Sequence, residues 1–248
     1  MTRPRLIVAL LVGDRGLVKT AGFADPLYVG DPVNAVRVFS RFGADEIMLL
    51  DINAGLAGRP IDFRLVEEVA SEATVPLSIG GGIRQLGDIA RIVAAGAEKV
   101  VIGRRAAEAP SFVAEAAREY GSSTISVCMD VGHAGQGDYA VRGLSGSTAA
   151  RPAEFARRME GLGAGELVVQ SIERDGTMAG YDLALIREVG AAVSVPVVAL
   201  GGAGCASDCA AAVEQGAASA AAAGSLFVFH RRRGAVLLSY PSRAERGL

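Results

Sequence analysis

Two glycine-rich stretches of this chain, Ile79–Arg84 and Leu200–Gly204, could each bind a phosphate group. Each follows a short apolar run and precedes an alanine-rich segment with helical character. Backbone N–H groups at the start of a helix bind anions, and glycine lets the backbone approach the anion closely. Gly80 and Gly201 lie 201 − 80 = 121 residues apart in a chain of 248. This spacing indicates a duplicated half-domain with two phosphate sites.

Few side chains in the sequence could hold a metal ion. There are two histidines, His133 and His230, which leaves a zinc site short of ligands. Three cysteines, at positions 128, 205 and 209, are too few and too irregularly spaced for a disulfide framework. We therefore expect neither a metal site nor a cofactor.

The composition limits the partners and the compartment. The net charge is −2, so no basic field indicates nucleic acid. Half of the residues (50%) are hydrophobic, yet no apolar run approaches the roughly 20 residues of a membrane span. The first residues lead directly into a strand-like segment, and we expect a cytoplasmic protein that binds no membrane.

Short apolar runs alternate with helix-like segments along the whole chain, which predicts an α/β protein, a single (β/α)8 TIM barrel over residues 1–248. The predicted strands are Leu6–Val12, Glu46–Leu50, Val75–Ile79, Lys99–Ile102, Thr124–Met129, Glu166–Val169, Pro196–Leu200 and Ala218–Ala223. The predicted helices are Pro32–Phe42, Phe63–Ser71, Gly87–Ala95, Ser111–Glu119, Pro152–Glu160, Leu183–Ala192, Ser207–Gln215 and Ala235–Leu238. The last predicted strand is nearly pure alanine and fits a helix equally well.

Two further patterns support a barrel made of two half-barrel repeats. Gly43–Glu46 recurs as Gly163–Glu166, an offset of 166 − 46 = 120 residues. The segments Gly13–Asp31 and Val131–Arg151 are longer than ordinary βα loops, and each follows the C-terminal end of a predicted strand. Barrel active sites lie at that end of the strands.

Four charged residues each open a predicted strand: Arg5, Glu46, Lys99 and Glu166. The N-terminal ends of parallel strands meet at the bottom of a barrel, so two acids and two bases would surround its axis. Such a ring either plugs the base of the barrel or controls a passage there.

Eight short motifs carry a family resemblance: Leu17-Val18-Lys19, Gly30-Asp31-Pro32, Leu50-Asp51-Ile52, Gly80-Gly81-Gly82-Ile83-Arg84, Gly96-Ala97-Glu98-Lys99, Arg174-Asp175-Gly176-Thr177, Gly180-Tyr181-Asp182-Leu183 and Gly201-Gly202-Ala203-Gly204. In these motifs the sequence resembles the cyclase (HisF) subunit family of imidazole glycerol phosphate synthase over nearly its whole length. The passages Tyr28–Val36 and Ser225–His230 are more similar to a paralogous branch, HisF-like proteins of surface-polysaccharide clusters that serve acetamidino modification of sugars. The resemblance implies a substrate loop with Lys19, and a glutaminase (HisH-like) partner whose ammonia enters through a gate that matches the four charged residues.

The family's chemistry uses two aspartates as an acid/base pair, at the ends of the first and fifth strands. Asp130 matches the second position, although a carboxylate there could instead cap the next loop. Leu11 stands at the first position, and the loss of an acid/base group costs about 10²–10⁴-fold in rate. Asp14 could replace it, but aspartate beside glycine is typical of a turn. We therefore expect weak or absent cyclase activity.

The resemblance also implies the phosphate ligands, which are Gly81, Gly82, Gly176, Gly202, Gly224 and Ser225. After Gly103, where the family has a short polar pair, this chain has Arg104 and Arg105. These arginines either bind a phosphate or diphosphate through their side chains or lie on a solvated loop. Arg231–Arg233 is expected to be a surface turn.

These inferences favour a barrel that docks a class I glutaminase on its lower face and receives ammonia there. The paralogous branch implies that a third protein, a sugar amidotransferase, uses the ammonia to amidinate a sugar. Two alternatives stay open. One is a true cyclase of histidine biosynthesis, which forms imidazole glycerol phosphate from ammonia and phosphoribulosyl formimino-aminoimidazole carboxamide ribotide. The other is a non-catalytic scaffold barrel. Leu11 argues against the cyclase and the charged ring argues against the scaffold.

Overall fold

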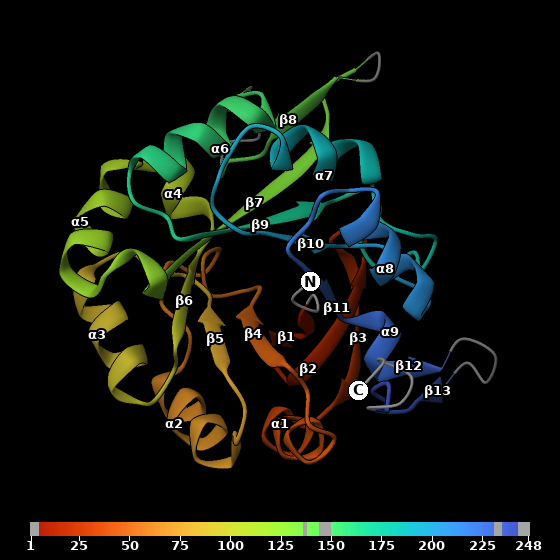
Figure 1. Cartoon of the computed structure of the whole chain (residues 1–248). Coiled ribbons are helices and arrows are strands. Elements are labelled where there is room, and N and C mark those ends of the chain that lie inside the picture. Colours follow the sequence, from red (N-terminus) through yellow and green to blue (C-terminus); the bar gives the residue numbers. More distant parts are fainter. Residues whose placement is uncertain (1–4, 136–137, 144–149, 231–234, 243–248) are drawn as a thin grey trace.

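The structure, a computed structural model that describes residues 5–135, 138–143, 150–230 and 235–242, is the predicted (β/α)8 TIM barrel (Figure 1). Eight parallel strands follow one another around the barrel, and β11 pairs with β1 to close it. In order around the barrel they are β1 (Arg5–Gly13), β4 (Glu46–Asp51), β5 (Leu77–Gly80), β6 (Lys99–Ile102), β7 (Ile125–His133), β9 (Glu166–Ser171), β10 (Val197–Leu200) and β11 (Ala220–Ala223).

Helices surround the strands on the outside (Figure 1). They are α1 (Pro32–Arg41), α2 (Phe63–Glu72), α3 (Leu86–Ala94), α4 (Arg104–Glu108), α5 (Ser111–Tyr120), α6 (Pro152–Gly161), α7 (Leu183–Gly190), α8 (Ala206–Glu214) and α9 (Ser225–Val228), with a 3₁₀ turn at Ser122–Thr124. Local sequence sets their starts. At α1, Asp31 accepts a hydrogen bond from the backbone N–H of Asn34 (2.7 Å), and Pro32 supplies a φ suited to the first turn.

The alanine-rich segment at the end of the barrel is a strand. All four residues of β11 are buried, and β11 pairs with β1 on one side and β10 on the other. Alanine prefers a helix, but two complete hydrogen-bond ladders outweigh that preference. Small side chains also suit a strand that is covered on both faces.

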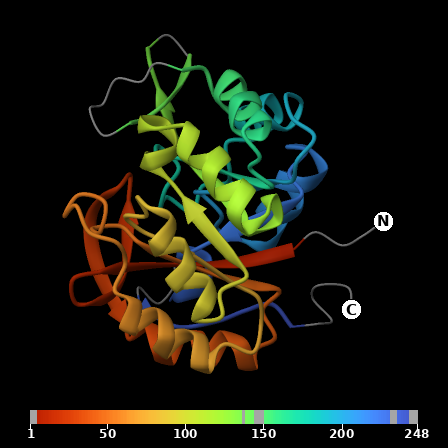
Figure 2. The ribbon, with the colours of Figure 1, turned by 90° about the vertical axis from the view of Figure 1, so that its left-hand side faces the viewer.

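The two segments predicted as long loops are largely antiparallel strands instead. β2 (Gly16–Ala21) pairs with β1, β3 (Ala24–Gly30) pairs with β2, and β8 (Tyr139–Val141) pairs with β7. Gly16 has a φ of +122° at the β1–β2 turn, and a Cβ there would lie 2.8 Å from the carbonyl oxygen of Gly30. The sequence therefore predicted the turn correctly, but it did not predict the strands on either side of it. Both hairpins project toward the same end of the barrel (Figure 2).

The last predicted helix, Ala235–Leu238, is wrong. Ala235 and Val236 form strand β13, which pairs with β12 (Phe229–His230), and both residues are exposed. Four apolar residues are too few to nucleate a helix without a packed face. The predicted surface turn at 231–233 lies outside the described residues.

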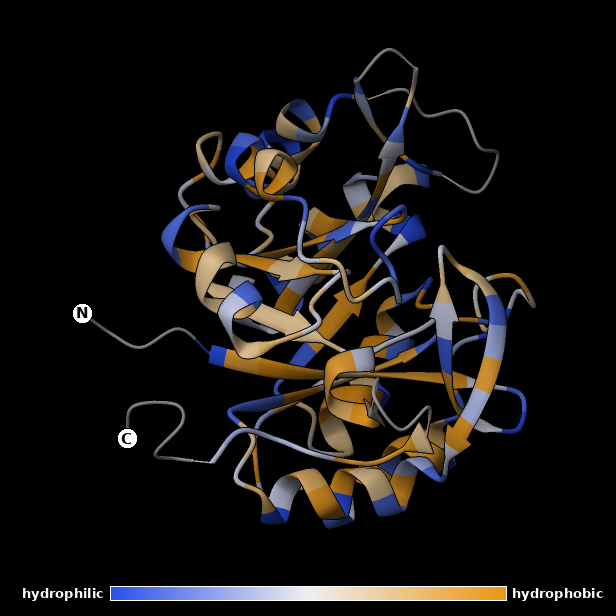
Figure 3. Ribbon diagram, turned by 90° about the vertical axis from the view of Figure 1, so that its right-hand side faces the viewer, coloured by the Kyte–Doolittle hydropathy of each residue, from blue (hydrophilic) through white to orange (hydrophobic). Residues whose placement is uncertain are grey.

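Hydrophobic side chains form two separate clusters. The larger one lies between the outer face of the strands and the helices, and includes Phe39 and Val66. The smaller one fills the barrel interior, where Ile7, Met48 and Val168 meet. Figure 3 shows the pattern along β1, which begins hydrophilic and is hydrophobic over most of its length. Among the described helices, the longest have ten residues, and none has the length and hydrophobicity needed to cross a bilayer.

Candidate functional site

Two cavities open at the end of the barrel where the strands have their C-termini. The first-half cleft encloses about 1380 Å³ and is lined by the segments that follow β4, β5 and β6, together with Asp130 of β7. The second-half cavity encloses about 580 Å³ and is lined by the segments that follow β9, β10 and β11, together with β2. Leu11, Thr20 and Gln170 line both. This end of the barrel thus has two cavities that share part of their lining.

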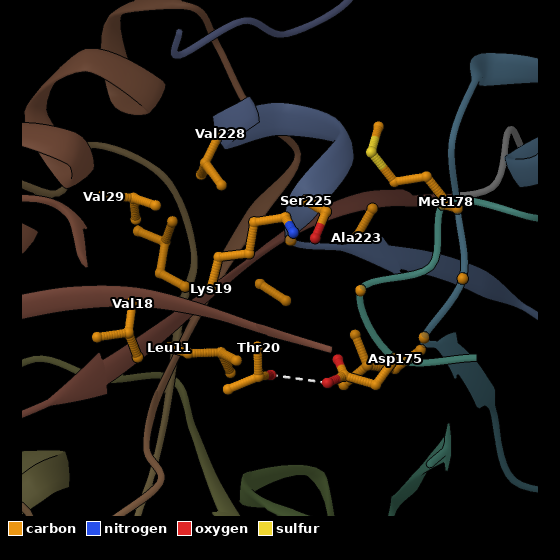
Figure 4. A pocket seen from close by; sticks show the side chains of 18 of the residues that line it. Leu11, Val18, Lys19, Thr20, Val29, Asp175, Met178, Ala223, Ser225 and Val228 are labelled. Carbon is orange, nitrogen blue, oxygen red and sulfur yellow. Dashed lines mark hydrogen bonds between the residues drawn. The ribbon is translucent and has the colours of Figure 1, made fainter. Parts of the chain in front are cut away.

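The second-half cavity brings together the four residues that the sequence assigned to its phosphate site: Gly176, Gly202, Gly224 and Ser225. Loops after the seventh and eighth strands and a short extra helix often form the phosphate site of a TIM barrel, and α9 is such a helix. Lys19 also lines the cavity and points toward Ser225 (Figure 4). It was predicted on a loop, but it lies on strand β2, with its Nζ 5.1 Å from the ring centre of Phe229.

A buried hydrogen bond joins the two sides of this cavity, and sequence reasoning missed it. The carboxylate of Asp175 accepts a hydrogen bond from the Thr20 hydroxyl at 2.7 Å (Figure 4) and another from the backbone N–H of Phe23 at 3.2 Å. These bonds fix the β2–β3 hairpin against the segment after β9. The sequence could have marked Asp175 as a site residue, because it lies in a family motif. Nothing in the sequence marks Thr20, since it lies 155 residues from its partner.

The structure gives three of the predicted glycines a reason other than anion approach. A Cβ on Gly82 or Gly176 would lie 1.9 Å from the carbonyl oxygen of Arg59 or Thr20, respectively. A Cβ on Gly202 would lie 2.3 Å from the carbonyl oxygen of Gly180. Each also has a positive φ. These glycines let neighbouring loops pack against one another. At Gly103 a Cβ would have no atom within 4 Å, so that position is open to a ligand.

The helices that follow the two glycine stretches have their N-terminal N–H groups occupied by the chain itself. Asp88 accepts from the N–H groups of Arg84 (3.0 Å) and Gln85 (3.1 Å) before α3. Asp208 does the same for Gly204 (2.8 Å) and Cys205 (3.1 Å) before α8. A carboxylate at a helix N-terminus already compensates the helix dipole.

The first-half cleft holds the residues predicted for the first phosphate site: Gly81, Gly82, Gly103 and Arg104. Asp51 lines it too, but its carboxylate is engaged by Arg59 at 2.9 Å and by the backbone N–H of Ala54 at 2.8 Å. Asp130 and Glu108 are the other acids of the cleft, and neither makes an ion pair in the described part of the chain. The cleft therefore combines two carboxylates outside any ion pair with several guanidinium groups.

Asp130 has the electrostatics of a proton-transfer group. Its burial raises the pKa of the carboxyl group to about 6, and nearby Asp175 raises the pKa as well, whereas Arg104 and a hydrogen bond from Cys128 lower it. The same burial raises the pKa of the Cys128 thiol well above its usual value, so this cysteine is not a nucleophile. A carboxyl group with a pKa near neutrality can donate or accept a proton at physiological pH.

The position opposite Asp130 is apolar. β1 and β7 are the first and fifth strands of the barrel, so they face each other across it. Leu11 on β1 lines the same cleft as Asp130. Asp14, the candidate substitute, lies in the exposed β1–β2 turn, where its carboxylate accepts from the side-chain amide of Asn53 at 2.9 Å. It is not among the residues that line either described cavity. The turn interpretation of Asp14 is confirmed.

At the other end of the barrel, the four strand-opening charges form one ion-paired ring. Lys99 contacts Glu46 at 3.3 Å and Glu166 at 3.0 Å. Arg5 pairs with Glu46 at 2.5 Å and also with Glu166. The two glutamate side chains are 2% and 5% exposed, whereas Arg5 is 34% exposed and is the outward member of the ring. Ser78 donates a further hydrogen bond to Glu46 at 2.6 Å.

The ring and the first-half cleft lie at the two ends of the same strands. On β6, alternate residues face the interior: Lys99 belongs to the ring, Val101 to the interior cluster, and Gly103 to the cleft. Four residues of strand span about 13 Å. The interior cluster of apolar side chains, which includes Met48 and Val168, therefore lies between the ring and the floor of the cleft.

Over the described residues, no group of three or more histidine, cysteine, aspartate or glutamate side chains could hold a metal ion. The chemistry that the cleft offers comes from Asp130, the arginines and backbone N–H groups.

Comparison with known proteins agrees with this geometry. The sequence profile of the histidine biosynthesis protein family matches residues 5–233. A Vibrio vulnificus protein with the provisional name imidazole glycerol phosphate synthase subunit hisF3 is 42% identical, over 99% of this chain and 96% of its own length. A Pseudomonas aeruginosa protein provisionally named subunit hisF2 is 42% identical, with 97% of each chain covered. The imidazole glycerol phosphate synthase subunit HisF of Alkaliphilus metalliredigens is 40% identical, over 93% of this chain and 92% of its own. The chain therefore belongs to the histidine biosynthesis protein family, among the HisF-like subunits of imidazole glycerol phosphate synthase.

Proposed function

We propose that this chain binds a HisH-like glutaminase at the bottom of its barrel and receives ammonia from it, while its own cyclase activity is weak or absent. In this proposal the ammonia serves the amidination of a surface-polysaccharide sugar by a separate amidotransferase. The passages Tyr28–Val36 and Ser225–His230, which resemble the paralogous branch, support this assignment of the acceptor.

The observation that carries the proposal is the contrast between the two ends of the barrel. The four-residue ring at the bottom is complete and ion-paired. At the top, Leu11 replaces one member of the acid/base pair. A buried ion-pair ring is weak as a source of stability, because the cost of removing its charges from water offsets most of their attraction. A role in passage explains its presence better than a role in folding.

The ring's charges also suit a gate. Two acids and two bases sum to zero, so the ring can stay partly buried without a counterion. Arg5 is its most exposed member, and a partner that offers a carboxylate at the barrel base could draw Arg5 outward. Ammonia would then cross the apolar interior of the barrel above the ring. A small neutral molecule crosses such an interior more readily than an ammonium ion does.

Glutaminase binding is the first test. The glutaminase encoded nearest to this chain in the same genome should co-purify with it, and glutamine hydrolysis should rise when the two are mixed. Coupling between two sites commonly changes an activity by about 5- to 150-fold. Arg37→Ala is the matched control, because it removes an ion pair with Glu72 on the helical surface and leaves the ring intact. If the chain neither binds the glutaminase nor changes its rate, the ring only closes the base of the barrel and the proposal is wrong.

Gene neighbourhood separates the two acceptor assignments. A glutaminase and an amidotransferase beside this gene support sugar amidination. Histidine-biosynthesis enzymes there support the true cyclase.

Phosphate binding in the second-half cavity is expected even where cyclase activity is lost. Crystals soaked in phosphate should show density beside Gly202, Gly224 and Ser225. Lys19→Met should weaken phosphate binding by about 10- to 150-fold, because one charge-assisted hydrogen bond contributes about 1.5–3 kcal/mol. Isothermal titration calorimetry measures the change. An empty cavity at high phosphate, or unchanged affinity in Lys19→Met, would contradict the assignment.

A further inference from the structure

Three arginines converge on the first-half cleft from two consecutive segments of the barrel, and we call them the arginine cluster. Arg84 follows β5, and Arg104 and Arg105 follow β6; all three line the cleft. In the described part of the chain, no carboxylate lies within 4.0 Å of their guanidinium nitrogens. Some other arginines of the described chain do pair with acids, such as Arg59 with Asp51.

Two of these guanidinium groups have a buried nitrogen without a hydrogen-bond partner. They are Nη1 of Arg104 and Nε of Arg105. A buried donor left without an acceptor costs free energy, and the cost is larger when the donor is charged. An anionic ligand or a water molecule in the cleft can supply the acceptor. Arg104 begins α4, and the Arg105 guanidinium lies 5.6 Å from the ring centre of Phe112.

The acids of the cleft do not neutralise the cluster. Asp51 is already paired with Arg59 and bonded to backbone N–H groups. Asp130 is near enough to Arg104 to interact with it electrostatically, but it is more than 4.0 Å from the guanidinium. Glu108 lies on the exposed end of α4. Three positive charges therefore face the cleft against two acids that are not engaged by a base.

The second-half cavity is lined by fewer charged side chains than the first-half cleft. Its charged lining residues are Lys19 and Asp175, and Asp175 is occupied by Thr20. One cation and backbone N–H groups suit a single phosphate. A phosphate carries about two negative charges near neutral pH, whereas a diphosphate offers more charge and more oxygens to three guanidinium groups on two segments.

We infer that the first-half cleft binds a ligand with two adjacent phosphate groups, a diphosphate, through Arg84, Arg104 and Arg105. This inference deepens the proposed function, because it names the class of phosphorylated ligand that the upper face of the barrel takes. It does not depend on the ring, which lies at the opposite end of the strands. Gly103 leaves room for the phosphates beside the arginines, since a Cβ there would have no atom within 4 Å.

Calorimetric titration of the full chain with inorganic pyrophosphate tests the inference. Titrations with inorganic phosphate and with citrate at the same ionic strength, without divalent metal, serve as comparisons. We expect pyrophosphate to bind at least tenfold more tightly than either. Arg104→Gln and Arg105→Gln should each remove most of this preference. Arg91→Gln is the matched control, because Arg91 stacks on Phe63, with its guanidinium 3.7 Å from the ring centre, and does not line the described cleft.

Several results would overturn the inference. They are equal affinity for phosphate and pyrophosphate, equal affinity for citrate, or an equal loss in Arg91→Gln. Circular dichroism checks that each variant is folded. If Arg104→Gln does not fold, Arg104→Lys keeps the charge but not the fork of donors, and it should still lose most of the preference. All of these variants should bind the glutaminase as the natural chain does, so failure of the diphosphate site and failure of the proposed function are distinguishable.

Discussion

Replacing Lys99 with alanine is expected to lower the free energy of unfolding and to uncouple glutamine hydrolysis from ammonia transfer. The two glutamates of the ring would then share one cation, Arg5, and the ring would carry a net negative charge. Breaking a fully buried ion pair costs about 3–5 kcal/mol. Arg5 remains and Lys99 is 17% exposed, so we expect a smaller loss of about 2 kcal/mol. Urea unfolding measures it, and affinity for the glutaminase should change little.

A second variant tests whether the lost positive charge of Lys99 causes the destabilisation. Lys99→Arg keeps the charge and should restore most of the stability. In a background with cyclase activity, Lys99→Ala should increase the glutamate formed per molecule of cyclised product. If Lys99→Ala leaves both stability and this ratio unchanged, the ring has neither role.

Replacing Leu11 with aspartate is expected to raise cyclase activity by about 10²-fold or more over the natural chain. The change restores an ionisable group opposite Asp130, and a positioned acid or base contributes about 10²–10⁴-fold to a rate. Both side chains line the first-half cleft, so the new carboxylate would face the same bound ribotide. Turnover of the ribotide at saturating ammonium measures the effect. A natural chain that already turns over at about 1 s⁻¹, an ordinary rate for an enzyme, would contradict the proposed loss of activity.

Leu11→Asn is the matched control, because asparagine has the size of aspartate and does not titrate. It should stay as slow as the natural chain. The pH dependence gives a second readout. The pKa of Asp130 is raised to about 6, and a second carboxylate nearby would raise it further. If Asp130 acts as the base, activity falls as the pH drops through that value, because the base must be ionised. An activity gain in Leu11→Asn equal to that in Leu11→Asp would exclude proton transfer as its cause.

Most of the barrel could be predicted from the sequence, because parallel strands buried on both faces read as short apolar runs. The prediction of Lys99–Ile102 is identical to β6, and the other barrel strands differ by a few residues at their ends. The hairpins at Gly16–Gly30 were missed because their glycines and aspartate suggested irregular structure. β3 has an exposed face and lacks the alternation that marks a half-buried strand.

The candidate site, like the fold, could be predicted from the sequence only in part. The sequence by itself determined the barrel, the family, the substitution at Leu11 and the positions of the glycines, because these depend on residue type and on order along the chain. Only the tertiary structure decided which groups meet. Arg5 pairs with Glu166 across 161 residues, and Thr20 bonds to Asp175 across 155. It also decided that Gly82 and Gly202 serve loop packing and that Asp88 and Asp208 occupy the helix ends. Such contacts depend on closure of the barrel, which brings residues together whatever their separation along the chain.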